Sequence, residues 1–493
     1  MTESLFLWQD LPGWLLSILW VVDLGIRVVM LGVVPGNRRP TTAMAWLLSI
    51  FFFPVVGLGL FLLFGNFKLS RKRIDRQTAV NQRVIDATET LDVDNGPPDA
   101  PDWVRSAIEL NRNLGAFPLQ EGNQFDFIKD SSESIRQMTE AIGSAKDYVN
   151  AQFYIVGDDP ELTGPFLRAL EDAADRGVRV RFLFDHLGTM RTAGYRELLR
   201  RLRASGIEWR RMLPISLLHL KWRRPDLRNH RKILVIDGEI AFTGSQNLIE
   251  PGYKRKSSQR IGREWIDLMA RVRGPMVTGL DVVFATDWSQ ETDENLLADL
   301  NEGGVPEPCG QQSGQIVPSG PGFESENNLR LFNTLMYSAT EKLTITSPYF
   351  VPDDSMLYAI TTAAQRGVEV ELLVSERGDQ ALVHHAQQSY YLQLLKAGVK
   401  IYRYHQPMVL HTKCFTVDDE VAVFGSSNMD MRSFSLNLEV SLMLLGPQAV
   451  GQINKVQDAY KEKCTLLTLD DWLGRPRTVR YLDNVARLTA TLQ

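Results

Sequence analysis

The chain has 493 residues, of which 44% are hydrophobic and 23% are charged, and its 54 basic and 59 acidic side chains give a formal net charge of −5. This length allows several domains with buried cores, and the composition excludes collagen-like, coiled-coil and wholly disordered chains. The mild acidity also argues against a dedicated nucleic-acid-binding protein, which would carry a basic excess on one face.

Two long apolar stretches, residues 14–34 and 43–64, open the chain. Each is long enough to cross a hydrocarbon layer of about 30 Å as a helix, so we predict a membrane hairpin over residues 1–67. The second stretch carries no charge, whereas the first contains Asp23 and Arg27, which can pair on one helical face. A tilted or interfacial helix is the alternative for the first stretch. A cleaved signal peptide is disfavoured because no basic region precedes that stretch.

Basic residues are distributed unevenly around these stretches. Two arginines lie between them, and five basic residues follow the second, namely Lys68, Arg71, Lys72, Arg73 and Arg76. The positive-inside rule then places the larger cluster, both ends of the chain and the remaining residues in the cytoplasm. We expect residues 68–120 to form a basic juxtamembrane segment and linker.

The rest of the sequence repeats itself. SAKDYVNAQFYIV at residues 144–156 matches SATEKLTITSPYFV at residues 338–351, and each is followed by an Ala-rich run that ends at Arg-Gly and by a Val-x-Val strand. This order predicts a β-α-β unit in each copy. We therefore expect an α/β fold of two domains, 121–300 and 323–493, related by a pseudo-twofold axis and joined by the Gly/Pro-rich residues 301–322.

Both copies contain the pattern His-x-Lys, four residues, Asp, six residues, Gly-Ser-x-Asn. The first set comprises His230, Lys232, Asp237, Ser245 and Asn247, and the second comprises His411, Lys413, Asp418, Ser426 and Asn428. Strand-like residues follow each lysine, so that each histidine and its lysine project to one face. A single such motif is usually an ordinary strand face, but a duplicated set with a shared downstream turn predicts chemistry.

An imidazole beside a fixed cation suits a phosphodiester. Lys, Ser and Asn can hold the phosphate oxygens, while one histidine attacks phosphorus and the other protonates the leaving oxygen. Asp237 and Asp418 belong to the motif, but their spacing from the histidines favours turn capping over proton transfer.

Each histidine also needs an acceptor that orients its far ring nitrogen. Glu439 follows the second motif on a predicted strand, and Asp267 lies at the matching position after the first. About nine extra residues precede Asp267, and Glu264 is the alternative there.

The duplicated motif resembles the HxKxxxxD signature of the phospholipase D superfamily. The N-terminal apolar hairpin and the phrases SPYFVPDD and NMDMRSF make the chain similar to the bacterial cardiolipin synthases over essentially its whole length. The resemblance implies two phospholipase D-like α/β/α sandwich domains and a transmembrane helical hairpin. It further implies a multi-pass protein of the bacterial inner membrane whose catalytic domains are cytoplasmic.

The same resemblance implies reversible phosphatidyl transfer between two phosphatidylglycerol molecules, giving cardiolipin and glycerol with no metal or other cofactor. His230 would then form a phosphatidyl-histidine and His411 would act as general acid and base, although the two roles can be reversed. A membrane phospholipase D that uses water as acceptor is the main alternative. A nuclease is disfavoured by the hairpin and the acidity, and a non-catalytic scaffold by the two intact motifs.

One further segment is a candidate for lipid contact. Residues 196–232 contain twelve basic and three acidic side chains, with leucines, Trp222, Arg223 and Arg224 among them. This composition fits an anionic membrane surface. A solvated helix followed by a buried segment is the alternative.

Overall fold

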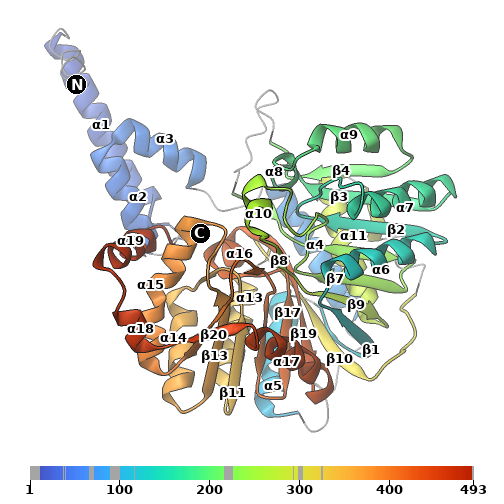
Figure 1. The fold of residues 1–493 in the computed structure, drawn as a ribbon. Coiled ribbons are helices and arrows are strands. Elements are labelled where there is room, and N and C mark those ends of the chain that lie inside the picture. Colours follow the sequence, from blue (N-terminus) through green and yellow to red (C-terminus); the bar gives the residue numbers. More distant parts are fainter. Residues whose placement is uncertain are drawn as a thin grey trace. The chain divides into compact units, whose positions relative to one another are not determined.

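Figure 1 shows the computed structural model of the chain, which describes residues 12–36, 38, 40–65, 71–88, 100–115, 117–215, 226–292, 294–297, 304–323 and 326–490. These residues belong to two compact units, Met1–Lys68 and Leu69–Gln493. The described part of the first unit is helical, and the second unit is built on a large sheet.

The first unit contains α1 (Gly13–Val33), α2 (Pro40–Phe52) and α3 (Pro54–Phe64). Within the described residues, α1 is the one helix that is long and apolar enough to cross a membrane. The predicted pair of Asp23 and Arg27 forms on it, with 2.7 Å between Oδ2 and Nε. The prediction of one continuous helix over residues 43–64 is wrong. The helix ends before Pro54, whose ring lacks an N–H and disfavours helical geometry at the preceding residue.

A mixed sheet of 16 strands runs through the second unit in the order β20-β14-β13-β11-β16-β17-β19-β10-β1-β9-β7-β6-β2-β3-β4, with β5 paired to β19. The strands of the first half are β1 (Leu119–Ile128), β2 (Tyr148–Phe153), β3 (Arg179–Asp185), β4 (Glu208–Met212), β5 (Arg228–Asn229), β6 (Ile233–Ile236), β7 (Ile240–Gly244), β8 (Trp265–Ile266) and β9 (Met269–Arg273). Those of the second half are β10 (Gln312–Ser319), β11 (Lys342–Thr346), β12 (Phe350–Val351), β13 (Glu369–Ser375), β14 (Lys400–Tyr404), β15 (Val409–Leu410), β16 (Cys414–Val417), β17 (Val421–Gly425), β18 (Met429–Asp430), β19 (Asn437–Leu445) and β20 (Cys464–Leu467).

The strand order is nearly the same when it is read outward from the β1–β10 pair in either direction. On one side lie β9, β7, β6, β2, β3 and β4, and on the other lie β19, β17, β16, β11, β13 and β14. The predicted duplication is thus one continuous sheet with a pseudo-twofold axis between β1 and β10. Residues 312–319 of the predicted joint are themselves the central strand β10, which pairs antiparallel with β1 and β19.

The predicted β-α-β units are present in both halves. Strand β2 pairs in parallel with β3 through α7 (Thr163–Asp175), and β11 pairs in parallel with β13 through α14 (Asp354–Gln365). Each helix ends at the predicted Arg-Gly, because Gly177 and Gly367 adopt φ values of 89° and 97° that a side chain would disfavour.

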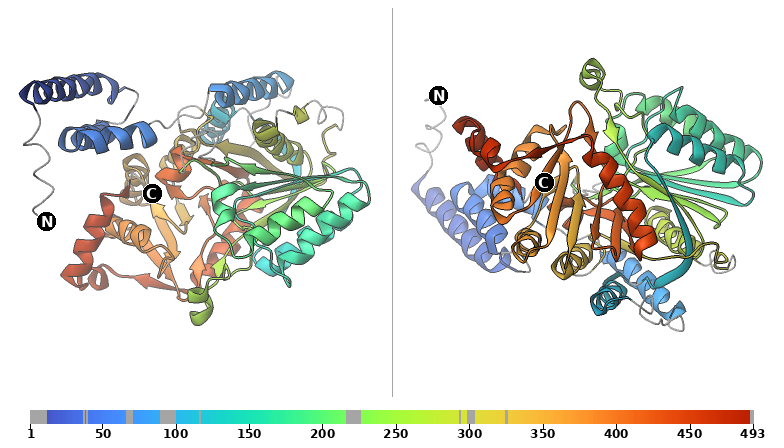
Figure 2. Two further views of the ribbon diagram at one scale, coloured as in Figure 1. Left: turned by 90° about the horizontal axis from the view of Figure 1, so that it is seen from above. Right: turned by 60° about the horizontal axis from the view of Figure 1, so that its bottom comes forward.

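Helices cover both faces of the sheet (Figure 2). The first half carries α6 (Ser131–Gly143), α7, α8 (His186–Met190), α9 (Tyr195–Ala204), α10 (Lys256–Ile261) and α11 (Met276–Thr292). The second half carries α13 (Asn327–Ser338), α14, α15 (Ala381–Ala397), α16 (Met431–Ser435), α17 (Pro447–Lys461), α18 (Leu469–Leu473) and α19 (Arg477–Arg487), while α4 (Arg71–Ala87) and α5 (Asp102–Gly115) precede β1. One apolar core contains residues of both α11 and α17, so the two halves share a core at the centre of the sheet.

Candidate active site

Each motif histidine follows a two-residue strand that pairs with the opposite half of the molecule. Strand β5 pairs with β19, and the His230 amide donates to the Leu438 carbonyl at 2.8 Å. Strand β15 pairs with β8, and the His411 amide donates to the Ile266 carbonyl at 2.8 Å. The two motifs therefore meet at the pseudo-twofold axis, where each is anchored on the other copy.

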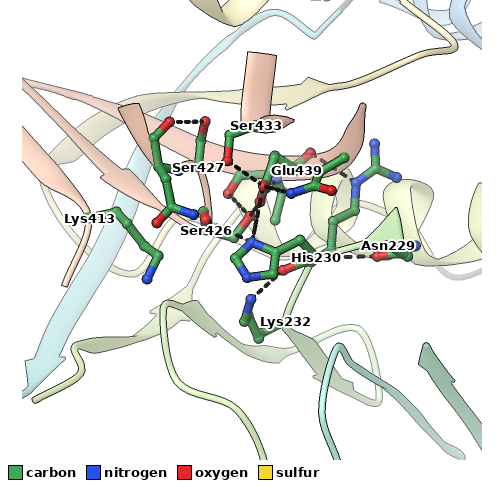
Figure 3. A network of polar contacts seen from close by, with 12 residues as sticks. Asn229, His230, Lys232, Lys413, Ser426, Ser427, Ser433 and Glu439 are labelled. Carbon is green, nitrogen blue, oxygen red and sulfur yellow. Dashed lines mark hydrogen bonds and ion pairs between the residues drawn. The ribbon is translucent and has the colours of Figure 1, made fainter. Parts of the chain in front are cut away.

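The orienting carboxylates are exchanged between the halves. Nδ1 of His230 lies 2.9 Å from Oε2 of Glu439, and Nδ1 of His411 lies 2.7 Å from Oδ1 of Asp267 (Figure 3 shows the first pair). Both carboxylates that the sequence singled out thus contact a motif histidine. Glu264, the alternative to Asp267, instead accepts a hydrogen bond from the Val409 amide through its backbone carbonyl.

The two motif serines hold these carboxylates. Ser426 Oγ donates to Glu439 at 2.5 Å, and Ser245 Oγ donates to Asp267 at 2.6 Å. Each Oγ also accepts a backbone amide at 3.0 Å, from Val440 or Leu268. Because the single hydroxyl proton points at a carboxylate, the serines are placed to position the histidines rather than to bind phosphate as the sequence predicted.

Burial decides the protonation of the histidines. It lowers the pKa of His230 to about 4 against the attraction of Glu439, and it also lowers the pKa of His411 against the attraction of Asp267. Burial would raise the pKa of Glu439, but contacts with His230, Lys232 and Ser426 outweigh it and leave that pKa lowered. A neutral imidazole beside a carboxylate donates through Nδ1 and leaves the lone pair of Nε2 available to a substrate.

The two motif lysines are buried beside the histidines. Each Nζ donates to the carbonyl of the histidine in its own motif at 2.5 Å, and Figure 3 shows both lysines near the His230 ring. Burial lowers the pKa of Lys232 to about 7, against the attraction of Glu439 and with the charge of Lys413 lowering it further. Burial lowers the pKa of Lys413 to about 8, against the attraction of Asp267 and Glu439. Two desolvated cations in one site favour an anionic ligand, which would restore their charge.

The motif aspartates lie at the other ends of strands β6 and β16, away from the histidines. Asp237 accepts from the amides of Lys146, Asp147 and Tyr148 at 2.8–2.9 Å. Asp418 likewise accepts from the amides of residues 340–342 and from the Thr340 hydroxyl. Both residues cap turns, with φ values of 51° and 50°. These contacts agree with the turn-capping role that the spacing of Asp237 and Asp418 favours.

The two motif asparagines differ. The Asn247 amide donates to the Tyr253 hydroxyl at 2.7 Å, and its oxygen accepts from the Ile155 amide at 3.3 Å. Asn428 Oδ1 is buried and has no hydrogen-bond partner among the described residues. Tyr253 belongs to the extra residues that precede Asp267, so this insertion makes the two halves of the site unequal.

Two aromatic residues of the site were missed by the sequence reasoning. The Tyr154 ring lies 4.9 Å from the His230 ring, and the Tyr349 ring lies 6.3 Å from the His411 ring, both edge-on. The available signal was their matching place in the repeat, where Tyr154 directly follows β2 and Tyr349 lies three residues after the end of β11. These rings form equivalent walls against the two imidazoles.

The predicted lipid-contacting segment is only partly described, because Trp222, Arg223 and Arg224 lie outside the described residues. In its first part, α9 buries Leu198 and Leu202 and exposes arginines, as the alternative of a solvated helix expects. Three of its basic residues, Arg228, Arg231 and Lys232, are buried in the site region and do not form a surface.

Comparison with known proteins agrees with this geometry. Residues 138–259 and 332–460 match the family model described as cardiolipin synthase, PLD-like domain, and residues 14–66 match the phospholipase D-nuclease N-terminal family. The cardiolipin synthase A of Proteus mirabilis (strain HI4320) is 34% identical over 477 residues, covering 94% of this chain and 95% of that protein. A cardiolipin synthase A of Klebsiella pneumoniae subsp. pneumoniae is 35% identical over 480 residues, covering 94% of this chain and 96% of that protein.

A solved structure shares the fold of the sheet unit. The phosphatidylserine synthase of Haemophilus influenzae Rd KW20 matches with a TM-score of 0.58 at 16% identity, covering 78% of this chain and 99% of that one. This likeness shows the fold alone, whereas the two matched domains and the near full-length similarity to the synthases show the family. The chain belongs to the cardiolipin synthases, phosphatidyltransferases of the phospholipase D superfamily.

Proposed function

We propose that the chain transfers a phosphatidyl group from one phosphatidylglycerol to a hydroxyl of a second, with His230 as the nucleophile and His411 as the acid and base. The observation that carries this proposal is the exchanged pair of His–carboxylate contacts, with two buried lysines beside them. It supports a mechanism in which two imidazoles with available Nε2 atoms act in one desolvated, cationic site.

Binding of the phosphodiester comes first. Its negative charge lies against Lys232 and Lys413 and raises their lowered pKa values, so both lysines become fully charged at neutral pH. The same charge raises the pKa of the histidines. Asn247 Nδ2 already donates to the Tyr253 hydroxyl, so Asn428 is the asparagine more available to donate to a phosphate oxygen.

In the first transfer, Nε2 of His230 attacks phosphorus, a P–N bond forms and the P–O bond to glycerol breaks. His411 gives a proton to the departing glycerol oxygen. Burial lowers the pKa of His230 to about 4, which keeps it unprotonated for attack. Asp267 faces His411 at 2.7 Å and stabilises the imidazolium that the acid role requires.

The second transfer reverses these steps with a new acceptor. A hydroxyl of the second phosphatidylglycerol loses its proton to His411 and attacks phosphorus, the P–N bond breaks, and cardiolipin leaves. Because the steps are the same in either direction, the reaction is reversible and needs no metal or other cofactor. Water in place of the lipid hydroxyl would give phosphatidic acid, so hydrolysis is the alternative that the products distinguish.

The test is product analysis with the purified full-length protein and vesicles of phosphatidylglycerol. Cardiolipin and glycerol in equal amounts support transfer, whereas phosphatidic acid and glycerol indicate hydrolysis. His230→Ala and His411→Ala should each abolish both products, and full activity in either variant contradicts the mechanism.

The roles of the histidines are separated with phosphatidyl-p-nitrophenol, whose leaving group needs no proton. We expect His411→Ala to release one equivalent of p-nitrophenol in a burst and then to stop, and His230→Ala to give no burst. The opposite result would reverse the two assignments.

A further inference from the structure

The helices α2 and α3 form an antiparallel hairpin, with paired contacts along their length. Near the turn, a Cβ on Gly57 would lie 2.4 Å from the Ser49 carbonyl oxygen, so the two backbones touch there. Farther along, the Trp46 and Phe61 rings pack edge to face at 5.5 Å. The end of α3 thus returns to the level at which α2 begins.

Arg38 holds the open end of this hairpin against the end of α1. Its guanidinium donates to the Gly65 carbonyl and to the Val34 carbonyl, each at 2.8 Å, and lies 4.9 Å from the centre of the Phe61 ring. The C-terminal end of α1, the start of α2 and the end of α3 therefore lie at one level. If the bilayer surface lies at this level, α1 ends at it, and the α2–α3 hairpin both begins and ends at it. All three helix ends are then on the same side of the bilayer.

Helix lengths separate the two parts of this unit. The 21 residues of α1 extend about 31 Å, enough for the hydrocarbon layer, whereas the 13 residues of α2 and the 11 of α3 extend only about 20 Å and about 17 Å. The turn between them is the most exposed apolar part of the hairpin, with Phe52 74%, Phe53 68% and Val55 85% exposed. A tip of this kind needs a hydrocarbon environment but cannot reach the far surface.

The chain beyond the hairpin has no room to change sides. Six residue steps separate Gly65 from Arg71, the first residue of α4, and they extend at most about 22 Å, less than the hydrocarbon layer of about 30 Å. The sheet unit therefore begins on the side on which α1 ends.

Charge then selects the orientation. Seven basic residues follow α1 up to residue 76, namely Arg38, Arg39, Lys68, Arg71, Lys72, Arg73 and Arg76, whereas residues 1–12 contain Glu3, Asp10 and no lysine or arginine. Under two spans the same charges divide as five against two. Under one span they divide as seven against none, which is a much stronger positive-inside signal.

We propose that α1 alone crosses the bilayer and that the α2–α3 hairpin enters and leaves the cytoplasmic leaflet from the cytoplasmic side. The segment before α1 then lies outside the cytoplasm, on the side of the bilayer opposite the sheet unit. The exposed apolar tip of the hairpin then contacts the hydrocarbon of the cytoplasmic leaflet.

The experiment maps three cysteines with a membrane-impermeant maleimide, in spheroplasts and after detergent permeabilisation. Cys309 is exposed and reports the catalytic unit in a Cys464→Ser protein, while Cys414 is buried and stays. Glu3→Cys and Gly36→Cys, each in a Cys309→Ser, Cys464→Ser background, report the segment before α1 and the α1–α2 loop. Cardiolipin production serves as the control for folding.

We expect Glu3→Cys to be labelled in intact spheroplasts, and Gly36→Cys and Cys309 to be labelled only after permeabilisation. Labelling of Gly36→Cys in intact spheroplasts while Cys309 stays protected would indicate two spans and overturn the proposal. Protection of Glu3→Cys together with Cys309 would overturn it as well. Because labelling does not depend on turnover, this outcome is independent of the proposed mechanism.

Discussion

Replacing Glu439 by glutamine tests how the site sets the state of His230. Both carboxylate oxygens of Glu439 lie within 3.0 Å of Nδ1, and they also accept from Ser426 Oγ at 2.5 Å and Ser433 Oγ at 3.0 Å. Ser426 donates to Oε2 and Ser433 to Oε1, so in Glu439→Gln one of these two oxygens becomes an NH₂ group that faces Nδ1 of His230 and donates to it. Nδ1 must then accept, the proton moves to Nε2, and the attacking lone pair is lost.

The expected loss is large because it affects the tautomer and not only one hydrogen bond. A carboxylate-to-amide change with this consequence lowers kcat by about 10⁴-fold in a Ser-His-Asp triad, and we expect a similar fall here. Asn437→Ala is the matched control, since Asn437 Nδ2 donates to the same carboxylate at 3.3 Å. Losing that one weak donor should lower kcat by less than about tenfold.

The burst of p-nitrophenol from phosphatidyl-p-nitrophenol is the assay. It reports the attack by His230 alone, so Glu439→Gln should slow the burst by the full factor. Asp267→Asn acts on His411 and should leave the burst nearly unchanged while it slows the later turnover. A slow burst in Asp267→Asn with a normal burst in Glu439→Gln would refute the assignment of His230, oriented by Glu439, as the nucleophile.

Three other predictions follow from the site and the hairpin. As the pH rises through about 4, kcat/KM should increase, because His230 loses its proton. Above a pH of about 7, kcat/KM should decrease, because Lys232 loses its charge. A constant kcat/KM through pH 7 would contradict the assignment of Lys232. Asp418→Ala should lower the free energy of unfolding by about 2–3 kcal/mol, because it leaves the amides of residues 340–342 without acceptors. The folded protein should keep its kcat and its pH profile. Denaturation and activity measured on the same sample check both expectations. Gly57→Ala should reduce the amount of folded protein in the membrane, because the added Cβ meets the Ser49 backbone. Gly59→Ala should not, because its added Cβ has no atom within 4 Å. Equal amounts of the two variants in the membrane fraction would contradict the hairpin packing.

Much of the fold was predictable because it rests on local patterns. The repeated strand, Ala-rich helix and Arg-Gly ends fix each β-α-β unit, and both histidines, both lysines and both carboxylates were identified from the duplicated motif and its downstream strands. The helix break before Pro54 was not predicted, because hydropathy measures burial in lipid and is insensitive to backbone continuity. Pro54 itself was the residue in the sequence that indicated the break.

The exchange of carboxylates was also beyond the sequence. His230 and Glu439 are 209 positions apart, and their contact depends on β5 pairing with β19 across the pseudo-twofold axis. The role of Ser245 and Ser426 depends on the same long-range pairing, since a Gly-Ser turn looks identical whether its hydroxyl faces a phosphate or a carboxylate. Residues whose roles depend on a distant strand need the assembled sheet.

The most direct test of the two-histidine mechanism is to identify the covalent intermediate. His411→Ala protein is mixed with phosphatidyl-p-nitrophenol, then quenched and digested at alkaline pH, and the modified peptide is located by mass spectrometry. The mechanism predicts one phosphatidyl group, attached to His230. A modified residue other than His230, or a full p-nitrophenol burst with no covalent adduct, would contradict it.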